Sequence, residues 1–143
     1  MENRIIKFRA FWKVVNEMRY FVQGNFREIS TNEGKQWAMT FTLSNGDGIY
    51  FCEADIMQFT GLLDKKGKES YNGDIIKLYS PYADEHIITE IKYDDKSTAF
   101  TVFAEGWFGI DGDIDISTLG WAVEQDMDFE IIGNIFEQPN LIK

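Results

Sequence analysis

The sequence has a single cysteine, Cys52, and a single histidine, His86. One thiol cannot close an internal disulfide, and it cannot build a zinc site that needs several thiolates. Long apolar runs are absent as well, because no stretch approaches the roughly 18 residues that a membrane-spanning helix requires. These scarcities exclude a disulfide-stapled fold, a multi-thiolate zinc site and a helical membrane span.

The first thirteen residues lack the uninterrupted apolar region of a secretory signal. Charged side chains interrupt them at Arg4, Lys7, Arg9 and Lys13. A signal peptide needs a continuous apolar segment of about 7–15 residues. We therefore expect a cytoplasmic protein without membrane partners.

Positive charge is scarce in the second half of the chain. The net charge is −10, from 14 Lys and Arg against 24 Asp and Glu. Residues 1–83 hold eleven basic and ten acidic residues, a net of +1, whereas residues 84–143 hold three lysines and fourteen acids, a net of −11. Such an acidic segment repels a phosphate backbone, so we do not expect nucleic acid as a partner. The acids either solvate one face or attract the more basic part of another subunit.

What the sequence does have is enough apolar material for one packed domain over residues 1–143. Hydrophobic residues make up 44% and aromatic residues 15% of the chain. A chain of this length buries about 68% of the surface that it exposes when unfolded. No Gly/Ser linker or low-complexity tract indicates a domain boundary.

Alternation of apolar and polar side chains predicts strands over 5–12, 18–26 and 36–43, the first as an edge strand. The clearest is 36–43, QWAMTFTL, in which every second side chain is large and apolar. SNGDG at 44–48 follows and is typical of a chain reversal, because its glycines adopt positive φ without steric cost.

The later part of the chain shows the same pattern. Residues 86–93 and 98–104 alternate on either side of a DDKS turn and predict a hairpin. Residues 129–136 form an apolar strand that Gly133 and Asn134 interrupt with a bulge or bend. Short helices are predicted only at 53–61 and 117–125, with a closing turn that begins at Pro139. The fold class is therefore mainly β: a partly open barrel or folded sheet of β-hairpins with one or two short helices.

Residues 60–79, TGLLDKKGKESYNGDIIKLY, contain two glycine-centred turns and a basic cluster. Asp64 and Gly67 fit a hairpin whose three-residue loop closes with a glycine bulge, and Asn72 with Gly73 fit a second reversal in a β-meander. A phosphate-binding P-loop does not fit. It needs Gly-x-x-x-x-Gly-Lys-Ser/Thr, whereas Gly61 and Gly67 are one residue too far apart and glutamate stands in the Ser/Thr position.

Three segments resemble the YopX family of small proteins encoded in bacteriophages and prophages. They are residues 58–79, QFTGLLDKKGKESYNGDIIKLY, residues 129–142, FEIIGNIFEQPNLI, and residues 4–12, RIIKFRAFW. The chain departs from the family at Asn72, where an acid is more usual, and at residues 12–18, where a more polar turn is common. The resemblance implies a mostly β fold, a phage or prophage origin, a bacterial host cytoplasm and self-association. It transfers no activity and no catalytic residue.

The most metal-like feature is GIDGDIDIS, with Asp111, Asp113 and Asp115 at alternate positions. The first ligands of a calcium-binding EF-hand loop have this spacing, but Ile116 and Ala122 stand where that loop needs glycine and glutamate. The other interpretation is a strand that exposes the aspartates and turns Ile110, Ile114 and Ile116 to the core or a neighbour.

Three other positions are candidates for chemistry. His86 is the one available imidazole, but it has no visible partner nucleophile and is predicted to be a surface residue. Cys52 is predicted to be a small core residue, because the neighbouring acid Glu53 disfavours a thiolate. Glu53 and Asp55 could form a carboxylate pair, but nothing in the sequence shows that they converge.

The front of the chain combines cations and aromatic rings of the types that contact phosphates and stack on bases. These residues are Arg4, Lys7, Arg9, Trp12, Lys13, Arg19 and Tyr20. The alternative, which we favour, is a strand pair whose charged outer row prevents edge pairing.

We therefore predict no catalytic, cofactor-binding or metal site. The leading hypothesis is a non-enzymatic phage or prophage accessory protein that self-associates and binds a host or phage protein. An acidic DNA mimic that binds a host nucleic-acid enzyme is the alternative. A carboxylate- or metal-dependent enzyme centred on Asp111, Asp113 and Asp115 is the third hypothesis.

Overall fold

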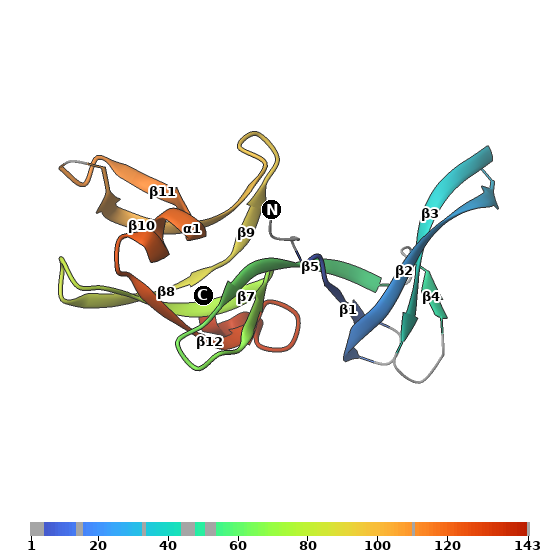
Figure 1. Cartoon of the computed structure of the whole chain (residues 1–143), viewed down its shortest axis with the longest axis horizontal. Coiled ribbons are helices and arrows are strands. Elements are labelled where there is room, and N and C mark those ends of the chain that lie inside the picture. The colour runs from blue at the N-terminus through green and yellow to red at the C-terminus, as the bar shows by residue number, and fades with distance from the viewer. Residues whose placement is uncertain are drawn as a thin grey trace. The chain divides into compact units, whose positions relative to one another are not determined.

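The computed structural model describes residues 5–13, 16–32, 34–43, 48–50, 54–109 and 111–142, and this part of the chain is mainly β-sheet (Figure 1). In chain order, the elements are β1 Phe8–Trp12, β2 Glu17–Thr31, β3 Gly34–Leu43, β4 Gly48–Tyr50, β5 Ala54–Leu63, β6 Glu69–Tyr71, β7 Asp74–Ser80, β8 Glu85–Glu90, β9 Lys92–Asp94, β10 Ala99–Phe108, β11 Ile114–Thr118, α1 Leu119–Glu124, β12 Asp128–Asn134 and the 3-10 helix η2 Pro139–Ile142. The expected fold class, folded and partly barrel-like sheets of hairpins with a short helix, is confirmed.

The described residues divide into two compact units. The first unit comprises Ile5–Gln58, and the second comprises the described residues from Phe59 onward. The chain passes from the first to the second within β5. The prediction that residues 1–143 form one domain stays a prediction.

The first unit is an antiparallel sheet with the strand order β4-β3-β2-β1-β5. Its strands confirm the predictions for 5–12, 18–26 and 36–43, and the pairing of Thr42 with Gly48 shows that the chain reverses between β3 and β4. Most of the SNGDG turn, residues 44–47, lies outside the described residues.

The prediction of β1 as an edge strand is wrong. β1 pairs with β2 on one side and with β5 on the other. Three consecutive residues, Arg9, Ala10 and Phe11, are buried, so both faces of the strand are covered. Alternation alone does not reveal that a strand has neighbours on both edges.

The second unit contains two three-stranded antiparallel sheets, ordered β12-β7-β8 and β11-β10-β9, together with the β5–β6 pair. Its core is formed by side chains from both sheets and from α1. These are Ile76, Leu78, Ile91, Val102, Ala104, Phe108, Leu119, Ala122, Met127 and Phe129. The burial of this apolar surface is the main favourable term that holds the two sheets and the helix together.

The DKKG segment forms the predicted hairpin. The N–H of Asp64 donates to the carbonyl of Lys68 at 2.8 Å, and the N–H of Gly67 donates to the carbonyl of Asp64 at 2.9 Å. Gly67 has a φ of 82°. These bonds and this φ define a three-residue loop that closes with a glycine bulge.

The turn at Asn72 and Gly73 is present, but it does not continue a meander as predicted. β6 pairs with β5, whereas β7 lies between β12 and β8, so the chain changes sheets at this turn. Gly73 donates to the carbonyl of Ile91 at 2.8 Å and accepts from the N–H of Ile135 at 2.9 Å. The turn is therefore held by the ends of distant segments, which local turn chemistry does not encode.

The predicted bulge near the C-terminus is confirmed, but the predicted hairpin over 86–104 is confirmed only beside its turn. β9 pairs with β10, whereas residues 86–90 belong to β8 and pair with β7, in the other sheet. β9 and β10 pair from Asp94–Ala99 onward, and Asp94 caps the turn by accepting from the N–H of Ser97 at 2.8 Å. In β12, the register with β7 shifts between Ile131 and Gly133.

Of the two predicted α-helices, one is confirmed and one is wrong. α1 lies within 117–125 and begins after Thr118, whose hydroxyl accepts from the N–H of Trp121 at 3.1 Å. η2 begins at Pro139 as predicted. Residues 53–61, in contrast, belong mostly to β5, in which Met57 and Phe59 are buried with a period of two. Within the described part of the chain, neither helix has the length and apolar character needed to cross a membrane.

Candidate functional site

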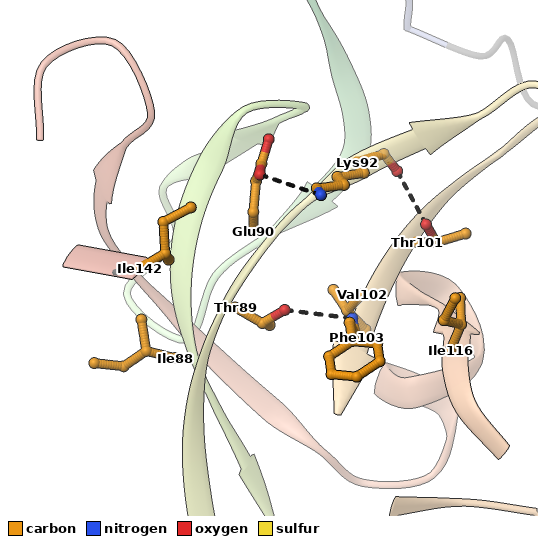
Figure 2. A pocket seen from close by; sticks show the side chains of 9 residues that line it. All are labelled: Ile88, Thr89, Glu90, Lys92, Thr101, Val102, Phe103, Ile116 and Ile142. Carbon is orange, nitrogen blue, oxygen red and sulfur yellow. Dashed lines mark hydrogen bonds and ion pairs between the residues drawn. The ribbon is translucent and has the colours of Figure 1, made fainter. Parts of the chain in front are cut away.

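The second unit has a hollow of about 350 Å³ between its two sheets, which we call the apolar groove (Figure 2). Its lining residues come from β8, β9, β10, β11 and η2. They are Ile88, Thr89, Glu90, Lys92, Thr101, Val102, Phe103, Ile116 and Ile142. Most of this lining is apolar, although it faces solvent.

One side of the groove is formed by Phe103 of β10 and Ile116 of β11. Alternation along β10 places Val102 and Ala104 in the core, so Phe103 points to the opposite face and is 54% exposed. Ile116 is its cross-strand partner and is 57% exposed. Figure 2 shows both side chains on the same side of the groove.

The other side is formed by Ile88 of β8 and Ile142 of η2. Both are large aliphatic residues with 49% and 40% of their surface exposed. Figure 2 shows them together, across the groove from Phe103. The turn that places Ile142 is fixed locally, because Gln138 binds Asn134 through both its backbone N–H and its side-chain oxygen.

The base of the groove joins the two sheets. The hydroxyl of Thr89 in β8 accepts a hydrogen bond from the N–H of Phe103 in β10 at 3.3 Å. Thr89 itself is buried. Because this bond connects the backbone of β10 to β8, it fixes Phe103 relative to Ile88 and preorganises the groove.

The titratable groups of the groove are Glu90 and Lys92, whose carboxylate oxygen and ammonium nitrogen are 3.8 Å apart. Only 16% of the Glu90 side chain is exposed. Burial raises the pKa of Glu90 above its ordinary value of 4.5, and the nearby Lys92 ammonium partly opposes this rise. The groove thus presents apolar walls and one ion pair, which suits it to binding an apolar surface.

A second hollow, of about 370 Å³, lies beside the groove and shares Ile116 with it. Ile114 and Trp121 are among its lining residues and are 49% and 40% exposed. Trp121 is held edge-on against Phe108, with ring centroids 5.9 Å apart. The exposed apolar surface therefore continues from the groove across β11 to α1.

Comparison with known proteins identifies the family. The model of the YopX protein family matches residues 7–143, which is nearly the whole chain. The chain belongs to this family. Among curated proteins, none matches the chain.

Two solved structures resemble this chain in fold. The crystal structure of YopX from Bacillus subtilis has a TM-score of 0.58 and 21% identity, and the match covers 96% of this chain and 98% of that one. The protein EF1440 from Enterococcus faecalis has a TM-score of 0.57 and 24% identity, with 99% and 100% covered.

In this YopX family member, the three aspartates singled out in the sequence do not form a metal cluster. Asp111 and Asp113 precede β11, whereas Asp115 lies within it and accepts a hydrogen bond from the N–H of Gly106 at 2.8 Å. All three are exposed. Across the described ranges, no three His, Cys, Asp or Glu side chains are grouped so that they could hold a metal ion.

Ile114 and Ile116 were expected to face the core or a neighbour, and the core is wrong. Both are about half exposed, because α1 supplies Leu119 and Ala122 to the core in this region. Ile110, the third isoleucine of that prediction, lies outside the described residues.

The remaining candidates lie apart from the groove. His86 is exposed on β8, as predicted, where it lines a polar hollow with Lys65, Lys77, Tyr79 and Asp128. Cys52 and Glu53, the latter one half of the predicted carboxylate pair, lie outside the described residues. Asp55 forms an ion pair with Lys13 at 3.3 Å.

The cations of the basic front are largely engaged within the first unit. Lys13 pairs with Asp55, Arg19 pairs with Glu17, and Arg9 is buried. Arg4 lies outside the described residues. This arrangement gives no support to a phosphate-binding surface.

Sequence reasoning did not identify the groove residues. One signal was present: β10 has apolar side chains on both faces, with Phe100, Val102 and Ala104 on one and Phe103 on the other. When both faces of a strand are apolar, either both faces pack against other parts of the protein or one apolar face is exposed to solvent.

Proposed function

We propose that this YopX family member is a non-enzymatic accessory protein that binds protein partners through its apolar groove and self-associates there. The single observation that carries the proposal is the exposed apolar surface of Ile88, Phe103, Ile116 and Ile142. Large apolar patches on otherwise polar proteins mark interaction surfaces, because water disfavours their exposure.

The charge around the groove gives the proposal a salt dependence. Residues 59–143 contain seven lysines and seventeen acids, a net charge of −10. Two copies of this unit repel each other at long range, and dissolved salt screens that repulsion. Apolar association is therefore expected to strengthen as salt is added, whereas attraction between basic and acidic segments would weaken.

The biological setting follows from the resemblance of residues 4–12, 58–79 and 129–142 to phage-encoded proteins. On this basis we propose a phage or prophage origin and action in the cytoplasm of a bacterial host, on a host or phage protein.

Neither alternative function is favoured by a specific contact. A DNA mimic needs carboxylates that are free to act as phosphates, yet Glu130 binds Lys65 and Lys66, and Asp115 binds a backbone N–H. The metal-dependent enzyme depends on three aspartates that are not grouped.

Sedimentation equilibrium of the full chain at low and high salt tests the proposal. We expect a concentration-dependent oligomer that becomes tighter at high salt. Phe103→Ser should weaken association by tenfold or more, because it removes an aromatic side chain that is 54% exposed and outside the core.

Tyr82→Ser is the matched control. Tyr82 is 73% exposed and lies in the turn between β7 and β8, and it is not among the residues of the groove. It should leave association unchanged. A chain that stays monomeric at high concentration and at both salt levels would overturn self-association, and an equal loss in both variants would overturn the role of the groove.

A further inference from the structure

β11 forms one outer sheet edge of the second unit. It is the outer strand of the β11-β10-β9 sheet. Its sequence, IDIST, contains no proline or lysine, two residues that often prevent an edge strand from pairing with another chain, and its one charged residue, Asp115, accepts from the N–H of Gly106 in β10. Ile114 and Ile116 on this strand are about half exposed.

The other outer strands of these two sheets are short or already contacted. The backbone of β12 is bound by the DKKG hairpin, with Lys65 donating to Phe129 at 2.9 Å and Ile131 donating to Asp64 at 3.1 Å. β8 contacts β10 and η2, and its Thr89 hydroxyl accepts from the N–H of Phe103. β9 has only three residues and begins with a lysine. These contacts leave β11 as the strand best able to accept a partner strand.

We propose that β11 pairs antiparallel with β11 of a second copy, about a two-fold axis at Ile116. The proposal rests on the self-association proposed above and assigns its interface. The pairing joins two β11-β10-β9 sheets into one sheet across the dimer, by the edge-to-edge addition through which sheets recruit extended strands.

The apolar residues support this register. Phe103 pairs with Ile116 within one copy. A two-fold axis at Ile116 places Ile116 of the second copy directly opposite Ile116 of the first. Phe103 of the second copy pairs with the Ile116 of that copy and therefore lies on its far side. Four apolar side chains that are each more than half exposed then form one cross-strand row, in which neighbouring pairs stabilise each other.

The polar residues select the same register. With Ile116 at the axis, Asp115 lies opposite Ser117 of the second copy, and Ile114 lies opposite Thr118. With Asp115 at the axis, two carboxylates would be directly opposed, which is destabilising. β11 is therefore complementary to itself at all five positions, and this self-complementarity favours a second copy over an unrelated strand.

Disulfide trapping tests the interface. In a Cys52→Ser background, Ile116→Cys leaves one thiol per chain, and residues directly opposed across a strand pair have Cβ atoms about 5 Å apart. Mild oxidation should then convert most of the protein to a covalent dimer. Tyr82→Cys, in the same background, places an equally accessible thiol outside β11 and should remain mostly uncrosslinked.

A charge variant tests the register without a cross-link. Ser117→Asp places a carboxylate opposite Asp115 at two symmetric positions and should weaken dimerisation about tenfold, whereas Ser117→Lys should strengthen it. Sedimentation of each unoxidised variant separates the two proposals. If the chain still associates but Ile116→Cys forms no covalent dimer, or if Ser117→Asp leaves association unchanged, the β11 interface is overturned and self-association stands. A monomeric parent chain overturns self-association as well.

Discussion

The carboxylate of Asp64 accepts a hydrogen bond from the backbone N–H of Ile131 at 3.1 Å, across 67 positions of the chain. Its other oxygen accepts from the N–H groups of Lys66 and Lys68, both at 2.9 Å. One buried side chain thus closes the DKKG loop and binds that loop to β12. The backbone N–H groups of this loop therefore donate to a carboxylate of the loop itself, in agreement with the rejection of a phosphate-binding P-loop.

Replacing Asp64 by alanine should destabilise the protein by about 3 kcal/mol, because three backbone N–H groups lose their acceptor in a buried setting. Urea unfolding followed by circular dichroism measures this change. Asp64→Asn is the matched control, since its amide oxygen can still accept from Lys66 and Lys68, and it should cost less. Equal losses in the two variants would contradict the role assigned to the loop bonds.

The same side chain predicts a loss of stability in acid. Burial raises the pKa of Asp64, but the hydrogen bonds from Ile131, Lys68 and Lys66 outweigh burial and lower the pKa below its ordinary value of 3.8. Because the folded-state pKa is the lower one, the stabilisation is complete above about pH 4 and disappears as the pH falls through the folded-state value.

Urea unfolding of the parent chain and of Asp64→Asn at several pH values between 2 and 6 tests this linkage. The parent chain should lose more free energy of unfolding on acidification than the variant does. Parallel curves would show that Asp64 does not contribute. The free energy of unfolding of Asp64→Asn should still depend on pH. Part of that dependence is expected to come from Glu130, whose pKa is lowered by Lys66 and Lys65.

The DKKG turn shows what the sequence could predict and what it could not. Asp64 and Gly67 specify the loop through local chemistry, so its type and its bulge follow from four or five neighbouring residues. The bond from Ile131 depends on β12 packing beside this loop, and no local pattern encodes a partner 67 positions away. For the same reason the turn at Gly73 was predicted, but the change of sheet was not.

The candidate surface was missed for a different reason. Alternation correctly predicted that Ile114 and Ile116 share one face of a strand, yet it could not tell which face is buried. That depends on α1, whose Leu119 and Ala122 occupy the core position. Periodicity determines which residues share one face of a strand, whereas tertiary packing determines whether that face is exposed to solvent or buried in the core.

Glu90 should respond to pH in the opposite sense to Asp64. Its pKa is raised above 4.5, chiefly by burial. A carboxyl group with a raised folded-state pKa destabilises the fold when it is ionised, and this cost disappears as the pH falls below the ordinary value. Glu90→Gln should therefore be modestly more stable than the parent chain at pH 7 and show no such advantage near pH 4.

Thermal unfolding at the two pH values measures the difference. Glu85→Gln is the matched control, because Glu85 is exposed on the same strand. It should change the unfolding temperature little at either pH. A destabilised Glu90→Gln variant at pH 7 would show that the ion pair with Lys92 outweighs the cost of burial.

Replacement by alanine of two glycines with equally open surroundings should change the free energy of unfolding in opposite directions. A Cβ atom added at Gly67 or at Gly120 would meet no heavy atom within 4 Å, so neither substitution is opposed by a clash. Gly67 has a φ of 82°, a conformation that costs an L-residue about 1–2 kcal/mol. Gly120 lies in α1, where alanine is favoured over glycine by about 1 kcal/mol.

Gly67→Ala should therefore lower the free energy of unfolding, and Gly120→Ala should raise it, in the same urea titration. The difference between the two variants should be about 2–3 kcal/mol. Because neither added Cβ atom meets another heavy atom, the sign of each change in the free energy of unfolding depends on backbone conformation alone. A stabilising Gly67→Ala would mean that the DKKG loop does not need a left-handed residue, and the glycine bulge that closes this hairpin would have to be rejected.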